Sequence, residues 1–497
     1  AGYKNVDGYY NVYIVSEAGF NNTTANTEVA IGYRALYTEG GDFGGNTAIG
    51  HQALTNQSGS VGGRMENTAV GASAGGSLTT GVRSVFVGNG AGIAVTTGGY
   101  STMLGWRAGY STTTGNSNTF LGNYAANTNT TGYDNIAIGG SAMYGGTVAH
   151  DNVAVGNDAL YNIGKTAAAG NSVGVGNGAG KYSTGSYNTF VGSAAGLGGT
   201  TSAPFSSGQN NVAVGYQALT AFTTGGSNVA IGTNAGNSLT SGASNIMIGN
   251  SVATALTTGA SNVIIGTIAG TAVSEGEKNV IIGREAGKDI SSGDSNIAIG
   301  YQALYVENTG TYAVSIGYRS GYKNRLSAQN ENVFVGSNAG RENTDGNDNV
   351  YVGYAAGYGV SSGGAGSNVA IGNYALYNAR NNENVAIGHN AGFYATGSQN
   401  TFIGKDAGMG GTTSAPYSSG NFNTLVGFNA GKGASSAPYA SGQYNTVMGY
   451  NAHDAFTTGQ QNVAIGWEAA KSLTTGYYST FLGVRAGRSV TTGNVNT

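Results

Sequence analysis

The sequence predicts an all-β chain, a parallel β-solenoid of about 27 short coils with a repeat of mostly seventeen residues. Three observations predict this fold class. A strand-like segment that ends in glycine recurs along the whole chain, an asparagine precedes most of these glycines by four residues, and 90 of the 497 residues are glycine. No strict Gly-X-Y period is present, which excludes collagen. The 39% hydrophobic content and 32 tyrosines argue against a disordered chain.

The recurring glycine anchors the repeat. Fifteen of the twenty-six intervals are seventeen residues and the others run from sixteen to twenty-three, as expected for loop insertions in a solenoid. We expect one solenoid domain over 1–497, cut within a coil at both ends, with loop insertions near 197–210, 409–422 and 432–444. Each insertion holds one of the three prolines, Pro204, Pro416 and Pro438. The anchors are positions 15 (a valine), 32, 50, 71, 88, 105, 122, 139, 156, 176, 192, 215, 232, 249, 266, 283, 300, 317, 336, 353, 372, 388, 404, 427, 449, 466 and 483.

A three-residue strand is predicted before each anchor. Counted from the anchor, position −3 is always Val, Ile or Thr and position −1 is always Ile, Val, Leu or Met. These side chains share one face of a strand and favour a buried wall. Position −2, on the opposite face, is never charged. Two apolar faces are typical of parallel strands that pack on both sides, so we expect the coils to press against a further partner.

Position −4 predicts an asparagine ladder. Asparagine occupies it in twenty-one of the twenty-seven coils, and its amide can donate and accept hydrogen bonds from coil to coil. N-glycosylation is the alternative, although most of these asparagines lack the required Ser or Thr two residues later. Consecutive examples are Asn211, Asn228, Asn245, Asn262, Asn279 and Asn296.

The rest of each coil predicts tight corners. Position +3 is almost always alanine, position +4 is commonly glycine, and Thr-Thr-Gly segments recur about ten residues after the anchor. Small residues permit close approach of the backbone, and the Thr-Gly segments are typical of turns. One coil is therefore expected to hold the strand, a corner, a second short extended segment and a closing turn.

Composition excludes several functions. The chain has no cysteine, and its 20 Lys and Arg against 23 Asp and Glu form no basic stripe for nucleic acid. We expect no membrane span, no cofactor and no metal, and no enzyme activity.

The four histidines, His51, His150, His389 and His453, lie in distant coils and are expected on the surface. A carboxylate site could lie only among Glu275, Glu277, Glu285, Asp289 and Asp294, which basic residues interrupt.

One column of aromatic residues suggests binding. Rings recur directly after the anchor, and both tryptophans of the chain are among them. Exposed rings could stack on sugars, or they could cover the neighbouring glycines as packing. The candidate ligand contacts are Trp106, Trp467, Tyr216, Tyr301 and Tyr450.

The unit Asn-Val-Ala-Ile-Gly-x-x-Ala, as at 211–218, 228–235 and 296–303, resembles the head repeat of YadA-like trimeric autotransporter adhesins and related repeats of phage and viral fibres. This resemblance implies a left-handed β-roll, three identical chains around one axis, and adhesion at a surface.

The expected function is therefore an extracellular, structural and adhesive fibre on a cell or a virion. It is expected to form a homotrimer and to bind a surface glycan or another host ligand. Two alternatives stay open. A carbohydrate- or ice-binding plate is suggested by the Thr-Thr-Gly turns and the aromatic column, and a tailspike-like polysaccharide hydrolase is suggested by the acids at 275–294.

Overall fold

A computed structural model confirms the parallel β-solenoid. The chain forms two compact units, Ala1–Ile248 (unit 1) and Gly249–Thr497 (unit 2). The described residues of both units contain strands, turns and bends but no helix. The structure describes residues 1–38, 44–59, 64–165, 168–199, 205–306, 309–325, 331–359, 366–378, 381–410, 419–433, 441–455 and 457–495.

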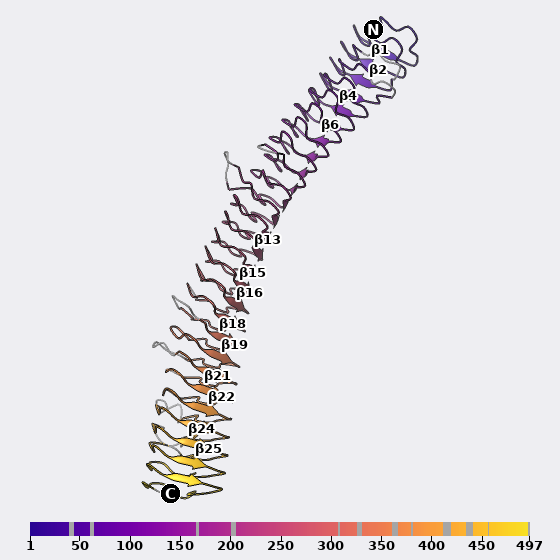
Figure 1. Cartoon of the computed structure of the whole chain (residues 1–497). Helices are drawn as coiled ribbons and strands as arrows, with labels where there is room; N and C mark the ends of the chain where they lie inside the picture. Colours follow the sequence, from indigo (N-terminus) through magenta and orange to yellow (C-terminus); the bar gives the residue numbers. More distant parts are fainter. Residues whose placement is uncertain are drawn as a thin grey trace. The chain divides into compact units, whose positions relative to one another are not determined.

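Every predicted strand forms, and each spans positions −3 to −1 of its coil. In Figure 1 the labelled strands of each unit follow one another in chain order. Unit 1 holds β1 (Val12–Ile14), β2 (Val29–Ile31), β3 (Thr47–Ile49), β4 (Thr68–Val70), β5 (Val85–Val87), β6 (Thr102–Leu104), β7 (Thr119–Leu121), β8 (Ile136–Ile138), β9 (Val153–Val155), β10 (Val173–Val175), β11 (Thr189–Val191), β12 (Val212–Val214), β13 (Val229–Ile231) and β14 (Ile246–Ile248). Unit 2 holds β15 (Val263–Ile265), β16 (Val280–Ile282), β17 (Ile297–Ile299), β18 (Val314–Ile316), β19 (Val333–Val335), β20 (Val350–Val352), β21 (Val369–Ile371), β22 (Val385–Ile387), β23 (Thr401–Ile403), β24 (Thr424–Val426), β25 (Thr446–Met448), β26 (Val463–Ile465) and β27 (Thr480–Leu482).

Neighbouring strands within each unit pair in parallel and in register. Val212, Ala213 and Val214 of β12 pair with Val229, Ala230 and Ile231 of β13. The same alignment joins β16 to β17 in unit 2. Because equivalent positions face each other at every step, each position of the repeat forms a column of like side chains along the unit.

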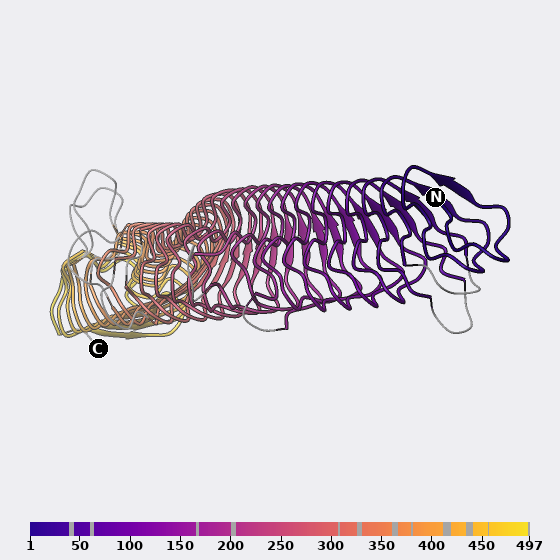
Figure 2. The same cartoon turned by 90° about the horizontal axis from the view of Figure 1, so that it is seen from above.

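Backbone hydrogen bonds continue from coil to coil outside the strands. In unit 1, the N–H of Gly109 donates to the carbonyl of Ala125, and the N–H of Thr113 donates to that of Thr130. Figure 2 shows the traces of successive coils in unit 1 running parallel. The expected second extended segment is largely absent from the described residues, where only isolated bridges such as His150 with Gly170 occur outside the strands. Residues with left-handed φ recur at positions +2 and +4 before this segment and at position −5 after it.

The interior of each coil is lined by position −2, which corrects the expected inside and outside of the strands. Phe86, Phe120 and Ile281 at this position are fully buried, together with the alanines of position +3. Positions −3 and −1 instead point outward and stay half-buried or exposed. The apolar character of −3 and −1 identified a packing face, but that face is not packed within the chain.

Positions −2 and +4 share the interior and compensate each other in size. Leucine at +4 always accompanies alanine at −2, as Leu304 accompanies Ala298, whereas phenylalanine at −2 accompanies glycine or alanine at +4. A Cβ atom added at Gly340 would lie 2.6 Å from the ring of Phe334. Many of the glycines at +4 are therefore needed for volume, as expected in an interior packed like a crystal.

Glycine at the anchor has a different cause from glycine at position +4. Gly283 has φ +133°, and a Cβ added there would lie 2.5 Å from the carbonyl oxygen of Gly300 in the next coil. A side chain at this position would meet both an unfavourable dihedral angle and this close approach of two backbones, and the one anchor that is not glycine, Val15, has φ +87°. The anchors thus hold neighbouring coils in register at the end of each strand.

Candidate functional site: columns of polar and aromatic side chains

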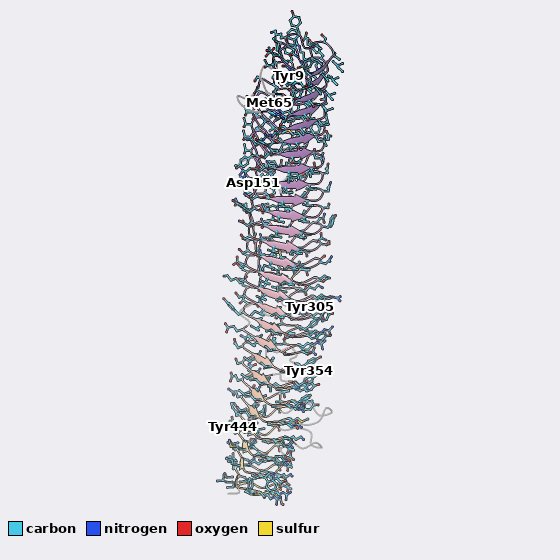
Figure 3. The ribbon with its side chains drawn as sticks, turned by 90° about the vertical axis from the view of Figure 1, so that its right-hand side faces the viewer. Tyr9, Met65, Asp151, Tyr305, Tyr354 and Tyr444 are labelled. Carbon is cyan, nitrogen blue, oxygen red and sulfur yellow. The ribbon has the colours of Figure 1, made fainter. Side chains whose placement is uncertain are left out.

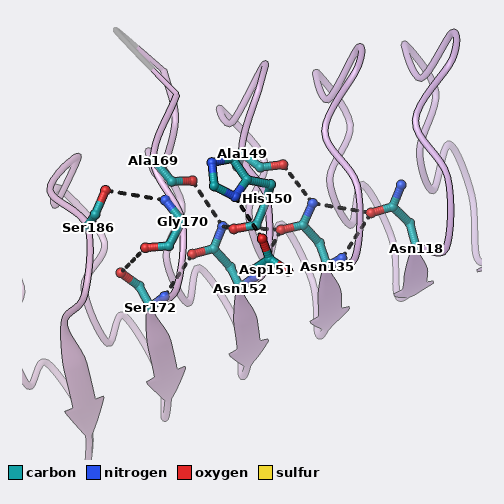
Figure 4. Close-up of polar contacts among 10 residues, drawn as sticks. All are labelled: Asn118, Asn135, Ala149, His150, Asp151, Asn152, Ala169, Gly170, Ser172 and Ser186. Carbon is teal, nitrogen blue, oxygen red and sulfur yellow. Dashed lines mark hydrogen bonds and ion pairs between the residues drawn. The ribbon is translucent and has the colours of Figure 1, made fainter.

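The asparagines of position −4 form a continuous chain of buried hydrogen bonds. In Figure 4, the backbone N–H of Asn135 donates to Oδ1 of Asn118 at 3.1 Å, and its Nδ2 donates to Oδ1 of Asn118 at 3.2 Å and to the carbonyl of Ala149 at 2.7 Å. Oδ1 of Asn135 in turn accepts from the backbone and side chain of Asn152. Each amide therefore links two neighbouring coils.

The asparagines singled out from the sequence make the same contacts within each unit. In unit 1, Oδ1 of Asn211 accepts from the N–H of Asn228, and Oδ1 of Asn228 accepts from that of Asn245, at 3.0 and 2.9 Å. In unit 2, the corresponding bonds run from Asn279 to Asn262 and from Asn296 to Asn279, both at 2.9 Å. All six are fully buried. Burial leaves no access for glycosylation at these side chains.

Glu28 occupies the asparagine column and is an unusual buried acid. Its Oε1 accepts from the backbone and side chain of Asn46, both at 3.3 Å, while among the described residues its Oε2 has no hydrogen-bond partner. Burial raises the pKa of Glu28 to about 8, although the hydrogen bonds from Asn46 oppose this rise. The carboxyl therefore holds its proton near neutral pH.

The histidines do not gather into a site. His51 and His389 are exposed, and the ring of His150 stacks on Tyr133 with 5.2 Å between ring centres while its Nδ1 lies 2.8 Å from Asp151. His453 contradicts the expected surface position, because it is fully buried at position +4, where other coils carry leucine, methionine, alanine or glycine. Burial lowers the pKa of His453 to about 4, opposed by a hydrogen bond with the backbone of Leu473.

The acidic stretch at 275–294 serves a structural contact. Oδ1 of Asp294 accepts a hydrogen bond from the backbone N–H of Glu277 in the preceding coil at 2.7 Å. Glu285 pairs with Arg284 and accepts from the side chain of Gln302. Nowhere in the described ranges do three His, Asp or Glu side chains gather as metal ligands would.

The aromatic column at position +1 is exposed and is partly engaged with neighbouring coils. Trp106, Trp467, Tyr216 and Tyr450 are 45%, 43%, 52% and 51% exposed, and Tyr301 is half-buried. Arg107 lies 5.1 Å from the ring centre of Trp106, and Arg485 lies 4.3 Å from that of Trp467. Tyr301 stacks with Tyr318, and Tyr450 stacks with Phe428. Trp106, Trp467, Tyr301 and Tyr450 are therefore already engaged in ring or cation contacts.

A second aromatic column at position +5 was missed from the sequence. Its rings stack in register, for example Tyr305 with Tyr322 at 5.0 Å and Tyr358 with Tyr377 at 4.9 Å between ring centres. The recurrence of Tyr or Phe five residues after the anchor could have predicted this column from the sequence. The ten members are Phe20, Tyr37, Tyr110, Tyr144, Tyr161, Tyr305, Tyr322, Tyr358, Tyr377 and Phe393.

The outward strand face is an uncharged surface that recurs at every coil of each unit. None of the twenty-seven strands contains a charged residue. The exposed fraction of the outward side chain is 37% for Ile231 in unit 1 and 40% for Ile371 in unit 2. In Figure 3, which shows this face, Tyr444 lies beside one end of the strands of unit 2, and Tyr354 lies beside the other. The result is an uncharged strip along each unit, made mostly of Val, Ile and Thr.

The expected loop insertions lie partly outside the described residues, and Pro204, Pro416 and Pro438 are among the residues that lie outside them. No helix within the described residues is long and apolar enough to cross a membrane. Neither a scan of protein-family models nor a search of curated proteins finds a match to this chain.

Proposed function

We propose that this chain is the shaft of an extracellular homotrimeric fibre that attaches to a surface. The observation that carries the proposal is the uncharged, partly exposed strip formed by positions −3 and −1. Parallel sheets are usually covered on both faces, and contiguous exposed apolar surface commonly marks an interaction site. A strip that recurs at every coil is suited to identical chains packed side by side.

The choice of three chains comes from the repeat itself. The Asn-Val-Ala-Ile-Gly-x-x-Ala unit resembles trimeric adhesin heads and viral fibre repeats, and we propose the same left-handed β-roll and three-fold assembly here. The strip then lies toward the three-fold axis, while the corner and turn columns stay on the outside. Attachment through outer side chains is compatible with this arrangement.

The two alternative functions have weaker support. The first threonine of several Thr-Thr-Gly turns donates its hydroxyl to the next coil, as Thr96 does to the carbonyl of Thr113 at 3.2 Å, and is already used in stacking. Asp294 is likewise engaged with the backbone of Glu277. Thermal hysteresis would favour an ice-binding plate, and cleavage of a polysaccharide would favour a hydrolase.

Single-cysteine cross-linking tests the interface, because the chain has no cysteine of its own. Ile387→Cys places a thiol on the strip, and Ser292→Cys places a matched control on an exposed turn of the same unit. A short bismaleimide should give covalent dimers and trimers with Ile387→Cys and mainly monomer with Ser292→Cys on a denaturing gel. Monomer alone from both folded variants would contradict the proposed interface.

A further inference from the structure

A groove of about 180 Å³ opens on unit 1 where three successive coils carry small side chains. Its lining holds the amides Gln52 and Asn56 and the hydroxyls Thr55, Ser73 and Ser77. Gly76 and Ile93 complete it. At roughly 30 Å³ per water molecule, the groove holds about six waters, which suits a single small ring better than a drug-sized ligand.

The groove exists because the aromatic column at position +5 is interrupted. Thr55, Gly76 and Ile93 occupy this position in three consecutive coils, between Tyr37 on one side and Tyr110 on the other. Phe20 stacks on Tyr37 from the preceding coil with 5.3 Å between ring centres. At the other end, Tyr110 leans over Gly90, since a Cβ added at Gly90 would lie 3.5 Å from the Tyr110 ring. The interruption of the aromatic column therefore lies between Tyr37 and Tyr110.

The chemistry of the lining selects the class of ligand. Amides and hydroxyls both donate and accept hydrogen bonds, and none of the lining side chains is ionisable. The cations at the two ends are engaged, since Arg34 pairs with Glu17 at 2.6 Å and Arg107 lies over Trp106 and Tyr110. A lining of amides and hydroxyls with one apolar side chain, Ile93, fits a ligand with many hydroxyls and one apolar face.

We propose that this groove binds one ring of a neutral saccharide. The site deepens the proposed function, on which its biological role rests, by naming the chemistry through which the fibre attaches. Binding itself does not depend on trimer formation, because every lining residue belongs to one chain.

Gly76→Tyr tests the site by closing the gap in the column. Gly76 does not have a left-handed φ, and the nearest atom to an added Cβ is the Ser73 carbonyl oxygen at 3.3 Å, so a shift of a few tenths of an ångström accommodates the side chain. Ten other coils already carry a ring at this position. The matched control, Thr271→Tyr, adds a ring at position +5 in unit 2, away from the groove.

The measurement is a glycan array of neutral and acidic oligosaccharides, followed by titration calorimetry with the best neutral hit. We expect the unmodified chain to bind a neutral glycan, Gly76→Tyr to weaken binding at least tenfold, and Thr271→Tyr to leave it unchanged. Absence of any neutral hit, binding to acidic glycans alone, or equal affinity of Gly76→Tyr would overturn the site. The oligomeric mass of the same samples separates the two ideas: a trimer that binds no sugar rejects only the groove, and a monomer that binds sugar rejects only the trimer.

Discussion

Asn279 illustrates what one residue contributes to the solenoid. Its Nδ2 donates to Oδ1 of Asn262 at 3.1 Å and to the carbonyl of Gly293 at 2.8 Å, while its own Oδ1 accepts from the N–H of Asn296 at 2.9 Å. All of these groups are buried in a chain that has no disulfide to hold its coils together. The net value of each bond is modest, but an unpaired buried partner costs about 1–3 kcal/mol.

Asn279→Ala is therefore expected to destabilise its own coil and both neighbours. It leaves the Gly293 carbonyl and the Asn296 N–H without their Asn279 partner, a loss of about 2–6 kcal/mol when both are counted. Urea denaturation and hydrogen exchange of the segment around β15 to β17 measure the effect. Asn250→Ala, at an exposed asparagine outside the column, serves as the control. Equal behaviour of the two variants would show that the column is not stabilising.

Glu28 should make the first coils less stable in alkaline solution. Its pKa of about 8 in the fold lies above the ordinary 4.5, so the folded chain binds the proton more tightly than the unfolded chain. The contribution to stability is complete below about pH 4.5 and is lost as the pH rises through about 8. Glu28→Gln removes the charge and should increase hydrogen-exchange protection around β2 and β3 at pH 8.5, with little change at pH 4.5. Equal exchange of variant and parent at pH 8.5 would contradict this account.

His453 should make the fold less stable in acid, whereas Glu28 makes it less stable in alkali. Its pKa of about 4 lies below the ordinary 6.5, because the buried ring is held neutral. The contribution to stability is complete above about pH 6.5 and is lost as the pH falls through about 4. His453→Leu, which introduces the residue that Leu304 and Leu376 provide at position +4, should abolish this loss. Urea midpoints of variant and parent that fall in parallel between pH 7 and 4 would refute the assignment.

At the scale of one coil, stability depends on how positions −2 and +4 divide the interior. Ala298 lies at −2 and Leu304 at +4 of the same coil, and both are fully buried. Leu304 has φ +51°, so a glycine is well tolerated there. The combination of phenylalanine at −2 with glycine at +4 occurs naturally in the coil of Phe334 and Gly340.

A double-mutant cycle tests whether the side chains at positions −2 and +4 share one interior volume. Ala298→Phe should overfill the coil and Leu304→Gly should leave a cavity, with each change costing about 1–4 kcal/mol. The double variant should recover part of this loss, with a coupling energy of about 1–3 kcal/mol in urea denaturation. The pair Ala298→Phe and Leu239→Gly, which lie in different units, is the additive control. Additive losses in the first pair would mean that the two positions do not share volume.

The strands were the most predictable elements, because each is marked by two β-branched or aliphatic columns and, in every coil except that of Val15, by a glycine directly after the strand. The asparagine contacts were also readable, since one residue type recurred at one position. The sequence did not show which strand face points into the coil, because both faces are apolar and only the closure of the coil decides which one is inside. The residues with left-handed φ at −5 and +2, such as Lys278 and Glu285, are of many types, so the sequence did not indicate their conformation. His453 was misplaced because histidine rarely replaces a buried leucine.

At the scale of the whole molecule, the proposed homotrimer depends on what covers the strip formed by positions −3 and −1. The side chains of the interior are buried, and the asparagines of position −4 hydrogen-bond to neighbouring coils, by contacts within one chain. The strip is different, since side chains such as Ile371 and Ile387 are 40% and 38% exposed with no charged residue beside them in the strands. Burial against identical chains would remove this apolar surface from water at each coil.

The mass of the folded chain in solution tests this claim most directly. Multi-angle light scattering at micromolar concentration should give three times the 49.6 kDa mass of the chain, and the value should stay constant on dilution through the low micromolar range. A mass of 49.6 kDa for a chain that retains its β-sheet circular dichroism would show that the strip is left uncovered, and would contradict the homotrimeric fibre.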